Sequence, residues 1–218
     1  MKKALSICFL MIIFSKVATA HAFGYDLTGL SGVATGWVYF KIGFQHILPY
    51  GLDHILFVLG LFFLNPNLKF VFLQTGLFTV AHCITLGLSM SGVINPDTSI
   101  VEPIIALSIL FVAIENIFTT QLKWWRLIIV FVFGLIHGCG FASALTDVGL
   151  PEGSYLSSLL MFNLGVEAGQ IAVILIAWIF VVKWFKECIW YRERIVVPVS
   201  GIIGCIALYW TIERTFFS

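Results

Sequence analysis

Six apolar segments follow one another along this chain, joined by short polar loops; the first of them is short. A helix needs about 20 apolar residues to cross the hydrocarbon core of a bilayer, and a spanning backbone must satisfy its own hydrogen bonds. Segments of this length therefore predict an all-α integral membrane protein built as a six-transmembrane-helix bundle. The segments are residues 51–65, 68–93, 98–118, 125–147, 155–183 and 195–216.

The composition supports a membrane protein and argues against several other classes. Hydrophobic residues make up 60% of the 218 residues and charged residues only 11%, whereas about a quarter of a soluble domain is charged. The formal net charge is +1, so no nucleic-acid partner is expected, and the surface is predicted to contact the lipid bilayer. The five cysteines form no C-x-x-C pair, which argues against zinc-ribbon and thioredoxin-like domains.

The N-terminus has the features of a signal peptide over residues 1–20. Two lysines precede a short apolar core, and Ala18-Thr19-Ala20 forms a small-residue cleavage site. Cleavage there would leave His21 at the mature N-terminus, where its amine and imidazole could chelate a metal ion or stay inert. Cleavage two residues later would remove it. The mature chain, residues 21–218, is then predicted to be a single transmembrane domain.

Charge in the loops predicts the orientation. Loops 94–97 and 148–154 contain acidic residues but no Lys or Arg. Because positively charged loops stay in the cytoplasm, the remaining loops are predicted to be cytoplasmic and both termini periplasmic, in a bacterial inner membrane. This order requires that residues 32–48 do not cross, so they are predicted to form a re-entrant or interfacial helix. The basic loops carry Lys69, Lys123, Arg126, Lys183, Lys186, Arg192 and Arg194.

The ionisable groups within or beside the apolar segments are histidines and acids. A charged group at the centre of a bilayer costs about 2.5 kcal/mol or more, so such residues are usually functional. Imidazoles and carboxylates together bind divalent metals such as nickel, zinc and cobalt. We therefore predict a metal site or a cation path, with Glu115 as the candidate on the cytoplasmic side. The predicted metal-site residues are His46, Asp53, His54, His82, Glu102, His137 and Glu167.

Counting residues from the loop ends, at about 1.5 Å per residue, gives each group a depth. One group falls towards the exported face: Asp53, His54 and Glu102. A second group falls near the midplane: His82, His137 and Glu167. Pro49 and Gly51 interrupt the helix ahead of His54 and could fold His46 back towards it.

Two of these acids have alternative explanations. Asp53 can ligate a metal, cap free backbone N–H groups, or orient a ligating histidine. Asn163, Glu167 and Gln170 are spaced i, i+4, i+7, which places them on one helical face turned to the bundle interior. Hydrogen bonding between helices explains the two amides, whereas an acid at this depth favours a functional role.

Five stretches of the chain contain these polar residues. They are Gly43-Phe-Gln-His46-Ile-Leu-Pro-Tyr-Gly51-Leu-Asp53-His54-Ile-Leu-Phe57, Phe78-Thr-Val-Ala-His82, Glu102-Pro103 with Glu115-Asn116, Phe133-Gly134-Leu-Ile-His137-Gly138, and Phe162-Asn163-Leu-Gly-Val-Glu167-Ala-Gly-Gln170. Together they resemble the HupE/UreJ family of hydrogenase and urease accessory membrane proteins, over about residues 40–215.

The resemblance implies a function. Members similar to this chain are proposed nickel permeases, in some cases cobalt permeases, of the bacterial inner membrane, and the H…G-x-D-H element is needed for transport. Carried over, that element implicates His46, Asp53 and His54. The gap from His46 to Gly51 is one residue longer than expected, and only His137-Gly138 represents the second histidine-rich motif. The chain therefore resembles a divergent side branch.

Three functions fit these observations. The first is a divalent transition-metal permease or uptake accessory protein, with nickel the most expected ion and zinc or cobalt the alternatives. The second is an intramembrane metal-dependent hydrolase, in which a fixed zinc-like ion on His54, His82, His137 and an acid activates water. The third is a non-transporting accessory or metal-sensing subunit. A homo-oligomer or an accessory partner is compatible with each.

Overall fold

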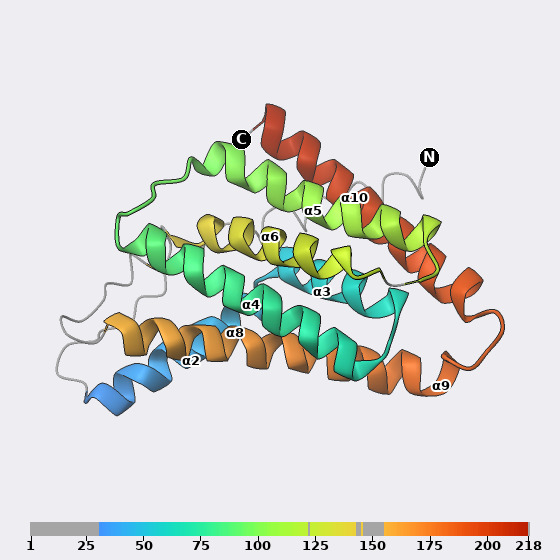
Figure 1. Ribbon diagram of the computed structural model, residues 1–218, viewed down its shortest axis with the longest axis horizontal. Helices are drawn as coiled ribbons and strands as arrows, with labels where there is room; N and C mark the ends of the chain where they lie inside the picture. Colours follow the sequence, from blue (N-terminus) through green and yellow to red (C-terminus); the bar gives the residue numbers. More distant parts are fainter. Residues whose placement is uncertain (1–30, 122, 143–144, 146–154, 218) are drawn as a thin grey trace, which may run out of the picture.

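A computed structural model describes residues 31–121, 123–142, 145 and 155–217, and all regular structure in these ranges is helical (Figure 1). The predicted signal peptide, His21 and the acidic loop 148–154 lie outside the described residues. The main helices are α2 (Gly32–Ile47), α3 (Leu52–Leu64), α4 (Leu68–Met90), α5 (Thr98–Phe118), α6 (Trp125–Gly140), α8 (Tyr155–Ala177) and α10 (Val197–Phe216).

Two π-helical turns lengthen the last helices. The turn η2 (Trp178–Val182) continues α8 into the short helix α9 (Lys183–Phe185). The turn η3 (Arg192–Val196) leads directly into α10. As a result, the C-terminal part of the chain forms two long apolar helices, Tyr155–Phe185 and Arg192–Phe216.

Short polar residues mark where three of the helices begin. The side chains of Ser31, Asn67 and Asp97 each accept a hydrogen bond from a backbone N–H in the first turn of α2, α4 and α5. At Asp97, the hydroxyl and the N–H of Ser99 both donate to the carboxylate, at 2.7 and 2.9 Å. These bonds lower the pKa of Asp97 from its ordinary value.

The helices confirm an all-α chain with several candidate membrane spans. Four of them are long and apolar enough to cross a bilayer: Leu68–Met90, Thr98–Phe118, Tyr155–Phe185 and Arg192–Phe216. A fifth candidate is the pair α2 and α3, which qualify together and are bent by 68° at the break between them. The helix α6 is apolar but has only 16 residues, about 24 Å of axis.

The segment 32–48 buries one face, with Tyr39, Ile42 and Ile47, and exposes the other, with Val33 and Trp37. Helix α2 packs against α8 with the two backbones in contact. A Cβ atom on Gly43 would lie 1.9 Å from the carbonyl oxygen of Phe162, and one on Gly165 would lie 2.0 Å from that of Phe40. Only glycine permits this approach. Together with α3 the segment forms a bent pair of the kind found in a broken span or a re-entrant loop, and its placement relative to the membrane stays a prediction.

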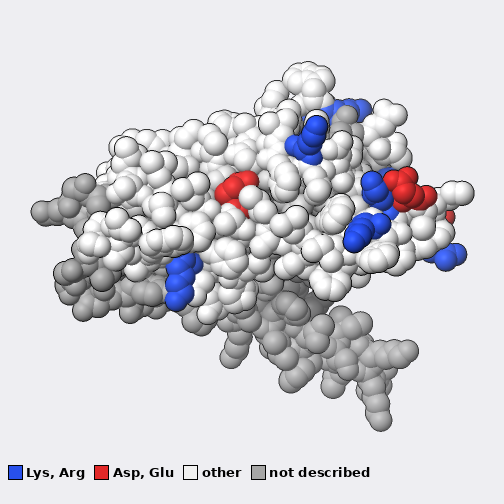
Figure 2. Space-filling view, turned by 90° about the horizontal axis from the view of Figure 1, so that it is seen from below, with Lys and Arg blue, Asp and Glu red and all other residues white. Residues whose placement is uncertain are grey.

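The two ends of the bundle differ in charge. Helices α4 and α6 begin, and α3, α5 and α9 end, at the same end of the molecule (Figure 1). Lys and Arg gather at this end, with a few acids beside them, whereas the middle of the same face carries little charge (Figure 2). We call this end the basic end; it contains Lys69, Lys123, Lys183, Lys186, Arg192 and Arg194.

Candidate metal centre

Three histidines from three helices meet inside the bundle. His46 is in the last turn of α2, His54 in the first turn of α3, and His82 in the middle of α4. One nitrogen from each ring can be chosen so that all three lie within 4.8 Å of one another. We call these residues the three-histidine cluster. The structure thus brings together three of the seven predicted metal-site residues.

The break between α2 and α3 brings the rings of His46 and His54 together in an edge-on, T-shaped contact. The N–H of Gly51 donates to the carbonyl of Ile47 at 3.0 Å, which closes the turn. A Cβ atom on Gly51 would lie 2.0 Å from the carbonyl oxygen of His46, so a larger residue would force the turn open. The ring centroids of His46 and His54 are consequently 4.7 Å apart.

The donor atoms of the cluster fit a metal ion. The Nε2 atoms of His46, His54 and His82 are buried and have no hydrogen-bond partner among the described residues. Leaving a buried polar atom without a partner costs about 1–3 kcal/mol. A divalent ion would satisfy all three atoms at once, with modest rotation of the rings to bond lengths of about 2.0–2.1 Å. Neutral imidazoles suit nickel, zinc and related ions.

Asn163 fixes which nitrogen of His82 carries the proton. The Asn163 amide donates from Nδ2 to the carbonyl of Leu159 at 2.8 Å, so its Oδ1 faces Nδ1 of His82, at 3.3 Å. An amide oxygen accepts only, and Nδ1 must therefore be the protonated nitrogen. The lone pair is left on Nε2, which is buried and has no partner among the described residues. A histidine ligand is usually held by such a bond to its second nitrogen.

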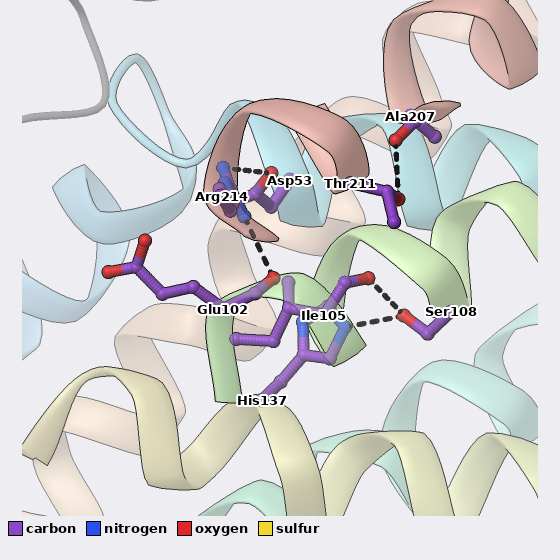
Figure 3. A network of polar contacts seen from close by, with 8 residues as sticks. All are labelled: Asp53, Glu102, Ile105, Ser108, His137, Ala207, Thr211 and Arg214. Atoms are coloured by element: carbon purple, nitrogen blue, oxygen red, sulfur yellow. Dashed lines mark hydrogen bonds and ion pairs between the residues drawn. The ribbon is translucent and has the colours of Figure 1, made fainter. Parts of the chain in front are cut away.

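His137 is arranged in the same way beside the cluster. The hydroxyl of Ser108 donates to the carbonyl of Ile105 at 2.7 Å, so its oxygen accepts from Nε2 of His137 at 2.9 Å (Figure 3). The lone pair then lies on Nδ1, which is buried and unpartnered among the described residues. The ring lies 5.0 Å from that of His54 but does not belong to the group of nitrogens within 4.8 Å.

Asp53 is held by an arginine rather than by the histidines. Both of its carboxylate oxygens accept from Nη2 of Arg214 at 3.1 Å, and Nη1 of Arg214 donates to the backbone carbonyl of Glu102 at 3.4 Å (Figure 3). The side chain of Glu102 is exposed and extends away from this contact. The pair therefore joins α3, α5 and α10, and Glu102 enters it through its backbone alone.

Glu115 is also paired with an arginine. Its carboxylate lies 2.9 Å from Nη1 of Arg126, and the side chain of Arg126 is only 1% exposed. The prediction that Arg126 belongs to a loop is therefore wrong, because it lies buried in the first turn of α6 and pairs with Glu115 of α5. Sequence reasoning missed both arginines as partners, since each is near the end of an apolar segment.

Glu167 lies outside the three-histidine cluster. It accepts a hydrogen bond from Thr79 at 2.6 Å, and Gln170 donates to the same hydroxyl at 3.1 Å. Asn163 and Gln170 are buried, as their spacing predicted. The opposing residues of α4 are Thr75, Thr79 and His82, which repeat the spacing i, i+4, i+7. This repeated spacing was the signal in the sequence that could have identified the threonines.

Comparison with known proteins identifies a family over most of the chain. A family model described as HupE / UreJ protein matches residues 26–214. No curated protein and no solved structure gave a significant match. The match covers all the helices described above except the last residues of α10. The chain belongs to the HupE / UreJ protein family.

Proposed function

We propose that this protein is a permease for a divalent transition metal, with nickel as the expected cargo. The observation that carries the proposal is the three-histidine cluster, in which three buried Nε2 atoms have no partner among the described residues. Membership of a family associated with metal uptake supports it. A ligand set of neutral imidazoles favours nickel, cobalt or zinc over magnesium or calcium, which prefer oxygen.

The proposed topology has six spans in a bacterial inner membrane. Helices α2 and α3 form one broken span, and α6 crosses at a thinned region of the bilayer. The basic end faces the cytoplasm, since lysines and arginines favour that side. Broken helices at the binding site are common in secondary transporters, where the interrupted backbone lines the cargo site. Here the break at Gly51 lies between two of the three ligands.

An intramembrane hydrolase is the second candidate, because three histidines and a water molecule are also a catalytic zinc site. Such an enzyme needs a general base within hydrogen-bond reach of the activated water. Asp53 is paired with Arg214, and Glu167 lies one helical turn away from His82 on the facing helix. The surroundings of the cluster therefore favour binding over hydrolysis.

Uptake of nickel into proteoliposomes tests the proposal. The wild-type protein should accumulate Ni²⁺, and His54→Ala should abolish accumulation by removing one of the three donors. Leu164→Ala is the matched control, since Leu164 is an exposed residue on α8. Equal flux in the wild type and in His54→Ala would refute the permease. A stoichiometric, chelator-resistant ion without any flux would support the hydrolase instead.

A further inference from the structure

Glu167 occupies a distinct position in the bundle. It lies on α8 one turn beyond Asn163, and its partner Thr79 lies on α4 one turn before His82. Three residues of helix correspond to about 4.5 Å. Because α4 begins at the basic end, Glu167 lies between the three-histidine cluster and that end of the molecule (Figure 1).

Glu167 accepts a hydrogen bond from the facing helix α4. The hydroxyl of Thr79 donates to Oε2 at 2.6 Å, a length typical of a hydroxyl bound to a charged oxygen. Gln170 Nε2 in turn donates to the Thr79 hydroxyl, which leaves the hydroxyl proton to Glu167. The side chain therefore accepts hydrogen bonds but receives no full positive charge from them.

Two other acids of the bundle are each paired with an arginine. Asp53 has Arg214 and Glu115 has Arg126, whereas no ion pair among the described residues includes Glu167. Glu167 is partly buried between apolar helices, where a carboxylate without a counter-charge is costly. A cation at this position would remove that cost, and no Lys or Arg of the described ranges lies within 4.0 Å to do so.

A second oxygen near Glu167 also lacks a partner. Gln170 is completely buried, and its Nε2 is committed to Thr79, the residue that also binds Glu167. Its Oε1 is buried and accepts no hydrogen bond from the described residues. A carboxylate and an amide oxygen on adjacent turns of α8 are ligands for a divalent cation that keeps part of its water.

We propose that Glu167 and Gln170 form a second cation station, which holds the divalent ion between the three-histidine cluster and the basic end. The inference rests on the proposed permease function. The cluster offers three neutral nitrogens, which select for transition metals, and the station offers one carboxylate, which attracts the charge of the ion. The ion would pass from the first site to the second. Two sites in series let each bind weakly enough to release, as conduction requires.

Glu167→Gln tests the station, because glutamine keeps the shape and the contact with Thr79 but removes the charge. Two measurements are made on the wild type, Glu167→Gln and His82→Ala: Ni²⁺ titration calorimetry in detergent and Ni²⁺ uptake into proteoliposomes. The wild type should show one strong and one weaker class of bound Ni²⁺. Glu167→Gln should lose the weaker class, keep the strong class and lower uptake by about tenfold or more. His82→Ala should lose the strong class of bound Ni²⁺ and keep the weaker class.

The results separate the station from the permease. Retention of the strong class shows that Glu167→Gln is folded. Binding of two classes without uptake by the wild type would refute the permease and keep the station as a binding site. Wild-type uptake and unchanged stoichiometry in Glu167→Gln would overturn the station. Loss of net uptake with unchanged stoichiometry and intact Ni²⁺ exchange would also overturn it, since Glu167 would then carry a proton.

Discussion

The three-histidine cluster and the two ion pairs both bring ionisable side chains from different helices together, but in the pairs the protein supplies the opposite charge. In the pairs, Asp53 and Glu115 each meet an arginine from another helix. In the cluster, three ring nitrogens meet without any partner from the described residues. A buried ionisable group therefore does not identify a ligand by itself. What distinguishes the cluster is that nitrogens from three histidines on three helices lie within 4.8 Å of one another.

The ion pairs are expected to contribute to the stability of the fold, whereas the three-histidine cluster is expected to bind the metal ion. The pair of Glu115 and Arg126 joins α5 to α6, and the pair of Asp53 and Arg214 joins α3 to α10. Each pair holds two helices together, and removal of one partner leaves a buried charge. The cluster holds three helices around a site that only an added ion completes. The two kinds of site should therefore respond differently to substitution.

The largest effect is expected at the ion pair that is more deeply buried. Arg126→Met leaves Glu115 buried and unpaired, and should lower the free energy of unfolding by about 3–5 kcal/mol. Chemical unfolding in detergent micelles measures the loss. The double variant Glu115→Gln/Arg126→Met should recover most of it, because neither charge remains. A double variant as unstable as the sum of the two single variants would contradict the pairing.

Opposite effects are expected at His82 and Asp53. His82→Ala removes one of three donors and should weaken Ni²⁺ binding by about 100-fold, or about 2.7 kcal/mol. Asp53→Asn should leave the affinity within about threefold and mainly lower stability, because its partner is Arg214. Calorimetric titration of both variants gives the comparison. If Asp53→Asn weakened binding as strongly as His82→Ala, the acid would be a ligand.

Substitution of Asn163 should have a smaller effect on Ni²⁺ binding, because Asn163 acts only by holding the proton on Nδ1 of His82. Asn163→Leu removes the acceptor that holds the proton on Nδ1, and should weaken Ni²⁺ binding by about tenfold. Asn163→Asp keeps an acceptor at the same place and should bind nearly as well as the wild type. Two variants with equal losses would show that Asn163 serves packing alone.

The smallest effect is expected at Ser108. Ser108→Ala removes the partner of His137, which lies beside the cluster and not within it. Stability should fall by about 0.5–1.5 kcal/mol, with no more than about a threefold change in Ni²⁺ affinity. Thermal unfolding and calorimetry on the same preparation measure both. A larger loss of affinity would make His137 a fourth ligand.

Much of the fold could be predicted from the sequence, because the length of an apolar segment sets whether it can span a bilayer. The long helices α4, α5, α8 and α10 follow this rule. Helix α2 does not, since it combines glycines that permit close packing with Lys41 and His46. Its packing against α8 depends on Gly165, which is far away in the sequence.

The candidate site could also be predicted in part from the sequence. Burial cost alone identified the histidines, and the spacing of Asn163, Glu167 and Gln170 identified a polar face. The arginine partners could not be predicted, since Asp53 and Arg214 are 161 residues apart and pair only after the helices pack. Without those partners, all the buried acids were equivalent as candidate ligands.

X-ray absorption spectroscopy of the purified protein loaded with one equivalent of Ni²⁺ tests the three-histidine cluster most directly. Scattering from imidazole rings counts the histidines bound to the metal. We expect three bound imidazoles in the wild type and in Asp53→Asn, and two in His82→Ala. A nickel ion bound by carboxylates with one imidazole or none, or a count unchanged by His82→Ala, would contradict the cluster as the metal site.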